Sequence, residues 1–224
     1  MNYKLIKDII NLVEEFEEQM PSASYNADVE GFKQWLQAGK SGLIAQAEEP
    51  YWEGKENGRS PESTINTLIV HMNRYAKTYS RSAISDSDFS TQEDFIYLIT
   101  LKSFGAMGKM ELIKRNIQDK PAGMKVIDRL LEKRWIEQQA SETDRRSKII
   151  KITDLGLEAL DRQMAKIRKA TQIVTGNLTQ KEKLDLIRIL QKLDDFHKPL
   201  YQKNLDAVTL LDTAYDKFLE NRPK

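Results

Sequence analysis

Residues 124–154 restrict the choice of fold more than any other stretch of the chain. In residues 124–132 the apolar side chains recur at helical spacing, which predicts an amphipathic helix with one face in a core. Two short apolar-bearing runs follow, at residues 135–139 and 147–152, and the second is rich in β-branched isoleucine. The segment between the runs is polar and has a turn-like composition, so the two runs predict a β-hairpin.

The tip of this predicted hairpin is charged, with Asp144, Arg145 and Arg146 in succession. A helix followed by a basic-tipped hairpin is the element order of a winged helix. In that arrangement the helix can lie in the DNA major groove, while an arginine of the wing reaches the backbone or the adjacent minor groove. The expected fold class is therefore mainly α (α+β), a winged helix-turn-helix with a small β-hairpin wing.

A second short helix precedes the first, and together they predict a helix-turn-helix over residues 109–133. Apolar side chains at helical spacing indicate a helix at 109–116, and a polar turn leads into the next helix at Pro121. Proline is tolerated there because the N–H groups of a first helical turn have no partner within the helix. The wing is expected over residues 135–152.

Helices are also expected on both sides of this unit. The signals are apolar periodicity, Ser60 before Pro61, capping boxes that begin at Ser90 and Thr179, and a cap at Thr153. They predict helices at residues 3–19, 28–37, 61–83, 90–101, 153–175, 179–196 and 204–219, with a loop at 39–60 and an interruption at Pro199.

The predicted elements divide the chain into three regions. Residues 1–60 are interpreted as an N-terminal helical extension, because two short helices make a poor core by themselves. Residues 61–198 hold the winged-helix domain. Residues 199–224 form a C-terminal helical extension.

Composition excludes several classes of protein. The chain is 40% hydrophobic and 31% charged, which permits a core and excludes wholesale disorder. It has no apolar run of about 18 residues and no signal-peptide layout, so a cytoplasmic protein without membrane contact is expected. The absence of cysteine excludes disulfides, thiolate metal sites and thiol-based redox sensing.

Charge is distributed unevenly along the chain. Residues 1–63 carry a net charge of −6, whereas residues 102–151 carry +6. The basic excess coincides with the predicted helix-turn-helix and wing. A local concentration of positive charge is typical of a surface that binds phosphates.

Three successive patterns are specific when taken together. They are residues 126–137, the Asp-x-Arg pattern of Asp144 and Arg146, and the Ile-Thr-x-x-Gly pattern of residues 152–156. In this order and spacing they resemble the MarR family of bacterial winged-helix regulators, over roughly residues 62–198. The resemblance implies a homodimer with a helical dimerisation region, to which the C-terminal extension would contribute, and two lobes that read a pseudo-palindrome in DNA.

The resemblance also assigns residues to DNA binding. Arg146 matches the arginine that enters the minor groove, and Asp144 matches its buttress. Arg145 and Lys148 are candidate phosphate contacts, and residues 120–129 match the recognition helix. The expected DNA-binding residues are Lys109, Lys120, Ala122, Gly123, Lys125, Arg129, Asp144, Arg145, Arg146 and Lys148.

The chain departs from the family pattern at two places. Its recognition helix opens with Lys120 and Pro121 instead of hydroxyl residues that bond bases or phosphates. Sequence preference would then depend on Lys120, Lys125, DNA shape and backbone amides. Arg134 stands where the family has a glycine before the wing, so it must adopt that backbone or alter the turn.

No catalytic, metal or cofactor site is expected. The two histidines, His71 and His197, lie in separate predicted helices and outside any catalytic or metal-binding motif. No Gly-rich phosphate loop follows a predicted strand.

The resemblance implies a small-molecule effector site between the dimer helices and the DNA-binding lobes. The residues expected near it are Tyr75, Tyr79, Phe95 and Phe104. Aromatic residues at helical spacing are more often part of a core, and that interpretation stays open beside the first.

Two functions remain. The favoured one is a sequence-specific DNA-binding transcriptional regulator, a ligand-responsive repressor that acts as a homodimer on double-stranded DNA and is not an enzyme. The alternative is a winged-helix protein-interaction adaptor that has lost specific DNA binding, which the altered opening of the recognition helix and the acidic extension suggest. The basic excess of residues 102–151 argues against the adaptor. A steep salt dependence of DNA binding would separate the two.

Overall fold

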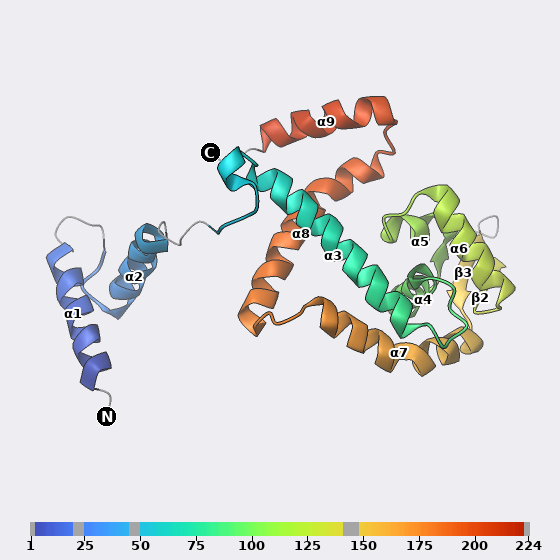
Figure 1. Ribbon diagram of the computed structural model, residues 1–224, viewed down its shortest axis with the longest axis horizontal. Helices are drawn as coiled ribbons and strands as arrows, with labels where there is room; N and C mark the ends of the chain where they lie inside the picture. Colours follow the sequence, from blue (N-terminus) through green and yellow to red (C-terminus); the bar gives the residue numbers. More distant parts are fainter. Residues whose placement is uncertain (1–2, 20–24, 45–49, 141–147, 222–224) are drawn as a thin grey trace. The chain divides into compact units, whose positions relative to one another are not determined.

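The computed structural model describes residues 3–19, 25–44, 50–140 and 148–221. These residues form helices and one small antiparallel sheet (Figure 1), and they divide into two compact units, Met1–Thr64 and Ile65–Lys224, which are described separately. A mainly helical chain with a small hairpin sheet confirms the predicted fold class. Within the described ranges, no helix combines the length and the apolar composition needed to span a membrane.

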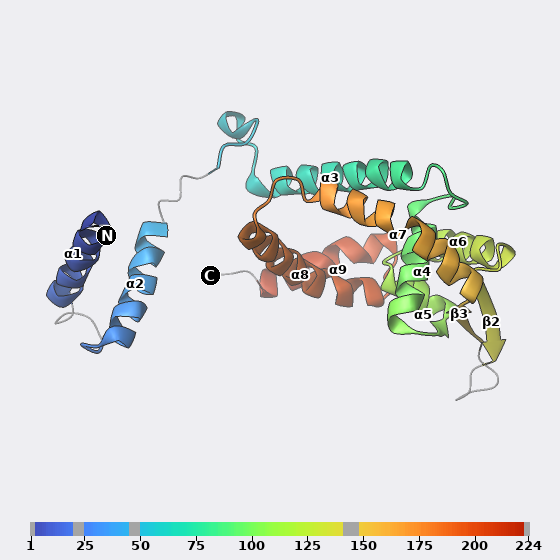
Figure 2. The ribbon, with the colours of Figure 1, turned by 90° about the horizontal axis from the view of Figure 1, so that it is seen from below.

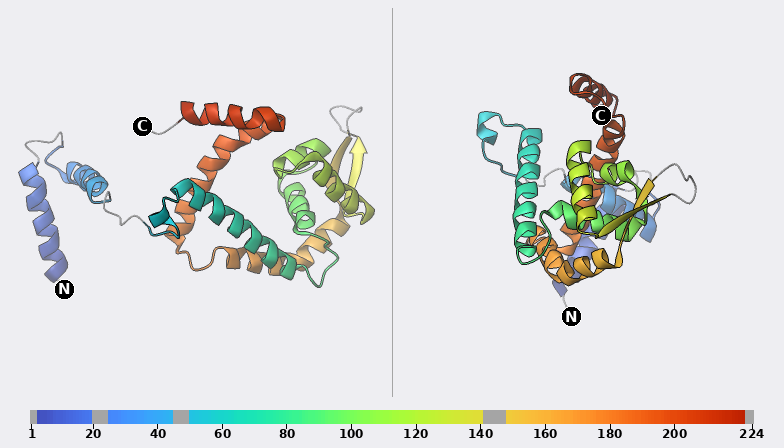
Figure 3. Two further views of the ribbon diagram at one scale, coloured as in Figure 1. Left: turned by 45° about the horizontal axis from the view of Figure 1, so that its top comes forward. Right: turned by 90° about the vertical axis from the view of Figure 1, so that its right-hand side faces the viewer.

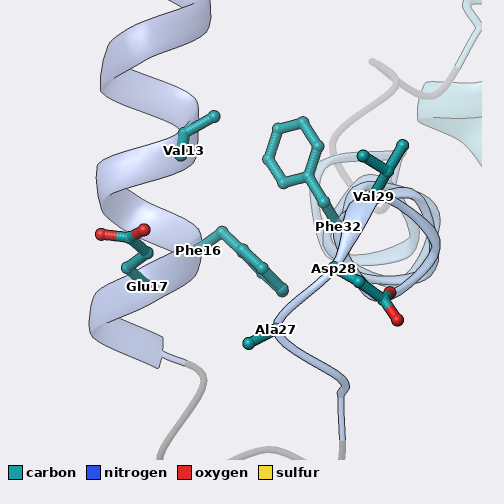
Figure 4. A pocket seen from close by; sticks show the side chains of 7 residues that line it. All are labelled: Val13, Phe16, Glu17, Ala27, Asp28, Val29 and Phe32. Atoms are coloured by element: carbon teal, nitrogen blue, oxygen red, sulfur yellow. The ribbon is translucent and has the colours of Figure 1, made fainter.

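The first unit contains α1 (Tyr3–Gln19) and α2 (Val29–Ile44), which pack through aromatic side chains. The ring of Phe16 lies 5.4 Å from the ring of Phe32 and 5.6 Å from the ring of Trp35, measured between centroids. In Figure 4, Phe16 and Phe32 project from the two helices into the space between them, at a cavity of about 430 Å³. The predicted amphipathic helices are therefore joined by a small aromatic contact.

The second helix begins as predicted but ends later. The carboxylate of Asp28 accepts a hydrogen bond from the backbone N–H of Gly31 at 2.7 Å and thereby caps the helix. The expected end at residue 37 is wrong, because α2 continues to Ile44. A glycine inside a helix costs only about 1 kcal/mol relative to alanine, so isolated glycines do not have to end it.

A short 3₁₀ helix, η2 (Lys55–Asn57), precedes α3 (Pro61–Ala83). The hydroxyl of Ser60 accepts a hydrogen bond from the backbone N–H of Ser63 at 3.3 Å, as expected for a helix that begins at proline. The boundary between the two units falls inside α3.

The second unit holds the winged-helix lobe and the C-terminal helices. Its elements after α3 are α4 (Gln92–Phe104), β1 (Met107–Gly108), α5 (Lys109–Arg115), α6 (Lys120–Glu132), β2 (Ile136–Ala140), β3 (Lys148–Ile152), α7 (Asp154–Val174), α8 (Gln180–Gln202) and α9 (Ala207–Glu220). The hairpin of β2 and β3 lies at the end of the lobe, beside α6 (Figures 2 and 3).

The sheet has the strand order β1-β3-β2, and both pairings are antiparallel. Met107 pairs with Ile150, and Ile136 pairs with Ile152. The predicted bounds of the two hairpin strands are correct within one residue. The strand β1 was not predicted, because two residues are too few to show an alternating pattern.

The core of the lobe lies where α4, α5, α6 and α7 meet the sheet. Its largest fully buried apolar side chains are Tyr97, Leu98, Leu101, Leu112, Ile113, Ile127, Leu130, Ile136, Ile150 and Leu160. Because they come from α4, α5, α6, α7, β2 and β3, burial of this set fixes the positions of the helix-turn-helix and the hairpin together.

Other predicted helix boundaries also differ from the structure. The capping box of α4 uses Thr91 and Asp94, one residue later than expected. Pro199 does not interrupt α8, which runs through it to Gln202. The break comes at Asn204, which has a φ of 48°. A proline destabilises a helix by removing an N–H donor and crowding the preceding turn. The helix continues through Pro199 because the next residue, Leu200, is buried.

Candidate nucleic-acid interface

The recognition helix α6 is positioned by close contact with α5. Asp119 caps α6, since its carboxylate accepts a hydrogen bond from the backbone N–H of Ala122 at 2.9 Å. A Cβ atom placed on Gly123 would lie 2.5 Å from Cγ1 of Ile113 and 2.8 Å from the hydroxyl oxygen of Tyr97. Glycine at this position therefore lets the two helices of the helix-turn-helix approach closely.

The two sides of α6 differ in character. Val126, Ile127 and Leu130 are buried in the core. Lys120 and Lys125 are exposed, and within the described part of the chain no ion pair engages either ammonium group. The helix thus offers free positive charge away from its packed face.

Arg129 has a different role, because it is bound to a buried carboxylate. Asp94, at the start of α4, is fully buried, and its Oδ1 accepts a hydrogen bond from Nε of Arg129 at 2.9 Å and a second from Nη2. Its Oδ2 accepts from the backbone N–H groups of Ser90 at 2.8 Å and Thr91 at 3.3 Å. The pair ties the recognition helix to the N-terminus of α4.

The wing begins directly after α6. Arg134 has a φ of 56°, so the arginine adopts the left-handed backbone that the family glycine would adopt without strain. The N–H of Trp135 donates to the carbonyl of Leu130 at 3.0 Å, which closes the helix end and directs the chain into β2.

The base of the hairpin is locked to the start of α7. The hydroxyl of Thr153 donates to the carbonyl of Arg134 at 2.7 Å and accepts from the N–H of Gly156 at 3.1 Å. A Cβ atom on Gly156 would lie 2.1 Å from the carbonyl oxygen of Trp135, so the Thr-x-x-Gly pattern has a steric basis. These contacts hold the hairpin in a fixed relation to the lobe.

The structure separates the predicted DNA-binding residues into groups. Lys120, Ala122 and Lys125 lie on α6, Lys109 is half-buried at the first residue of α5, and Lys148 is exposed at the first residue of β3. Gly123 and Arg129 contact other parts of the lobe instead. Asp144, Arg145 and Arg146 lie outside the described residues.

The residues expected near an effector differ in their burial. Phe95 is buried in the core of the lobe. Tyr75 and Tyr79 are exposed on α3, and Phe104 is 64% exposed at the end of α4, with the guanidinium of Arg115 over its ring at 4.7 Å. Among the described residues no group of three or more histidine, aspartate or glutamate side chains is arranged to hold a metal ion.

The hydrogen bonds that sequence reasoning missed join residues far apart in the chain. The bond from Arg129 to Asp94 spans 35 positions, and that from the hydroxyl of Tyr201 to the carbonyl of Gln118 spans 83. The only signal for the first was an acidic residue in the first turn of a predicted helix, and that signal indicates a cap rather than an ion pair.

Comparison with known proteins supports the arrangement. Residues 89–156 match the family described as winged helix DNA-binding domain. The HTH-type transcriptional repressor NicR of Pseudomonas putida is 26% identical over 105 residues, which span 47% of this chain and 66% of that protein, just under two thirds of its length.

Solved structures give the same result. The MarR C80S mutant of E. coli, in complex with operator DNA, is 25% identical with a TM-score of 0.53, and the match covers 58% of this chain and 93% of that one. BpsR of Bordetella bronchiseptica is 21% identical with a TM-score of 0.55, covering 66% of this chain and 99% of that one, and supports the fold alone. The helix-turn-helix, the antiparallel hairpin and these similarities together show that residues 89–156 form a winged-helix domain similar to that of MarR.

Proposed function

We propose that the protein is a sequence-specific DNA-binding transcriptional repressor that acts as a homodimer on a pseudo-palindromic operator. The observation that carries this proposal is the recognition helix. Its apolar side is buried by the lobe, while Lys120 and Lys125 are exposed on it next to a hairpin wing. A helix of this kind fits the major groove, and the wing is then close to the neighbouring backbone or minor groove.

The proposed contacts fall into two classes. Lys120, Ala122 and Lys125 lie near the start of α6, where side chains and backbone approach base edges and phosphates. Lys109 and Lys148, together with the wing residues 144–146, would bind the phosphate backbone or the minor groove, with Arg146 as the inserted side chain. We do not assign Gly123 or Arg129 to DNA, because their contacts lie within the lobe.

A homodimer follows from the apolar surface of the C-terminal helices. Leu200 is the only buried residue on α8, although α8 has 23 residues. The large exposed apolar side chains of α8 and α9 are Leu184, Leu186, Ile187, Ile189, Leu190, Leu193, Val208, Leu210, Leu211, Tyr215, Phe218 and Leu219. A surface of this extent is expected to be covered by a partner, and a second copy would place two recognition helices on a two-fold axis.

Regulation by a small molecule is part of the proposal. DNA binding by the similar BpsR is described as regulated by 6-hydroxynicotinic acid. In this chain an effector would act by favouring a spacing of the two lobes that mismatches the half-sites, which shifts the population away from the DNA-bound state.

The test is selection of bound sites from random duplex DNA at two salt concentrations. The affinity of the Lys125→Gln variant for the selected site is then measured by titration. We expect recovery of a pseudo-palindromic site and a loss of affinity of about tenfold for Lys125→Gln, with a change in the log-log salt slope of about 0.9 if the lysine binds a phosphate. The control is Lys169→Gln, an exposed lysine on α7, which should leave affinity unchanged. Selection that enriches no site would refute specific DNA binding.

A further inference from the structure

The C-terminal part of α8 contacts the turn that leads into the recognition helix. The hydroxyl of Tyr201 donates a hydrogen bond to the backbone carbonyl of Gln118 at 2.6 Å. The neighbouring Leu200 is 4% exposed, whereas the rest of α8 remains largely uncovered. The end of α8 is therefore anchored to the helix-turn-helix through these two residues.

The turn that Tyr201 contacts determines where α6 begins. Ile117 has a φ of 48°, a backbone conformation that is unfavourable for a β-branched residue and persists only when its surroundings hold it. Gln118 follows, and then Asp119, which caps α6. A shift of Gln118 would therefore move the first turn of the recognition helix.

Gln118 is also held from the opposite direction by the core. Its Oε1 accepts a hydrogen bond from the hydroxyl of Tyr97 at 2.5 Å. Burial raises the pKa of Tyr97 to about 12, and the nearby Tyr201 acts in the same direction, so this hydroxyl keeps its proton and donates at neutral pH. Two tyrosines, one in α4 and one in α8, thus bind the side chain and the backbone of a single residue.

The contact from α8 lies at the edge of a cavity rather than inside the core. A cavity of about 320 Å³ separates the helix-turn-helix from the segment that joins α8 to α9, and Lys114, Lys120, Tyr201 and Leu205 are among its lining residues. Tyr201 is itself only partly buried. Loss of its hydrogen bond would consequently leave the core of the lobe intact.

We propose that Tyr201 is a positioning residue, which fixes the first turn of the recognition helix from the C-terminal helices through the Gln118 carbonyl. The inference rests on the proposed function, because its effect is measured as the affinity of the protein for its DNA site. It connects the surface proposed to bind a second copy with the element proposed to read DNA. Movement of α8 relative to the lobe would then alter the placement of Lys120 without any direct contact between α8 and DNA.

The test uses Tyr201→Phe in the full chain, with Tyr51→Phe as the matched control. The phenylalanine keeps the ring and removes the donor. Tyr51 lies outside the surface proposed to bind a second copy and is 77% exposed, and its hydroxyl has no hydrogen bond within the described residues. Two quantities are measured, namely amide hydrogen exchange of residues 113–123 without DNA, and the ratio of affinities for the selected site and for unrelated duplex.

We expect Tyr201→Phe to speed exchange in the turn and to lower affinity for the selected site by about three- to tenfold, the range that one intramolecular hydrogen bond supports. Affinity for unrelated DNA and the salt slope should stay at wild-type values, because the phosphate contacts remain. Tyr51→Phe should match the wild type in both measurements.

Three results would overturn the inference. Exchange equal to the wild type would show that Tyr201 does not restrain the turn. Faster exchange with unchanged affinity for the selected site would show that the restraint does not reach DNA recognition. An equal loss of affinity for both kinds of DNA would indicate general damage to the lobe. If the wild type selects no site, the proposed function fails, and hydrogen exchange alone then decides whether Tyr201 restrains the turn.

Discussion

Replacing Asp94 by asparagine should destabilise the protein substantially. The carboxylate is fully buried and accepts hydrogen bonds from two backbone N–H groups and from two nitrogens of Arg129. An amide retains one oxygen and turns a donor toward groups that are themselves donors. Removing one partner of a buried pair costs about 3–5 kcal/mol. Because the Arg129 side chain is 26% exposed and keeps some water, we expect the lower end, about 3 kcal/mol.

The measurement is urea unfolding of the full chain, monitored by far-UV circular dichroism. The matched control is Asp161→Asn, which breaks the exposed pair of Lys102 and Asp161, where the side chains are 46% and 61% exposed and 2.7 Å apart. That change should cost less than about 1 kcal/mol. A loss below about 1 kcal/mol for Asp94→Asn would refute the reasoning, since burial would then add nothing to an ordinary surface pair.

A double-mutant cycle assigns the effect to the pair itself. Arg129→Gln leaves the carboxylate of Asp94 buried without its cation, and the double variant removes both charges. Coupling of at least about 1 kcal/mol is expected for residues in direct contact. Additive losses would place the effect in the cap of α4 instead.

Two further predictions concern a close contact and a helix cap. Gly123→Ala places a Cβ 2.5 Å from Ile113. The cost of overpacking, about 1–3 kcal/mol, should exceed the gain of about 0.5–1 kcal/mol in helix propensity, so the variant should be less stable. A urea midpoint at or above that of the wild type would contradict the close approach. The backbone N–H of Thr209 holds the pKa of Asp206 below its usual value, so the cap stabilises α9 above about pH 4 and is lost as pH falls through the lowered pKa. Asp206→Ala should therefore speed amide exchange at residues 207–210 at neutral pH and remove the acid-dependent step, and exchange identical to the wild type would count against the cap.

The parts of the fold that were predicted correctly depend on local rules. Apolar spacing located α6, because burial on one face of a helix imposes the helical period on the sequence, and enrichment in β-branched isoleucine located β3. Thr153 and Thr179 were predicted as caps and confirmed, since a cap involves residues only three positions apart.

Predictions failed where two local signals competed or where the deciding contact was distant. Ser90 and Thr91 both precede an acidic residue at the right spacing, and the ion pair of Asp94 with Arg129 favours the second. The strand β1 exists because Met107 pairs with Ile150, far along the chain. Pro199 stays within α8, where Leu200 is buried and Tyr201 is hydrogen bonded to the turn before α6.

The amino-acid sequence alone determined the order of the helices, the helix-turn-helix, the hairpin and the basic character of the segment that carries them, because each follows from residues close together in the chain. Only the tertiary structure decided which basic side chains remain without a carboxylate partner. It bound Arg129 to a buried aspartate 35 positions away, left Lys120 and Lys125 exposed, and brought Tyr201 to the carbonyl of Gln118. Pairings of this kind depend on packing between elements, which no local pattern encodes.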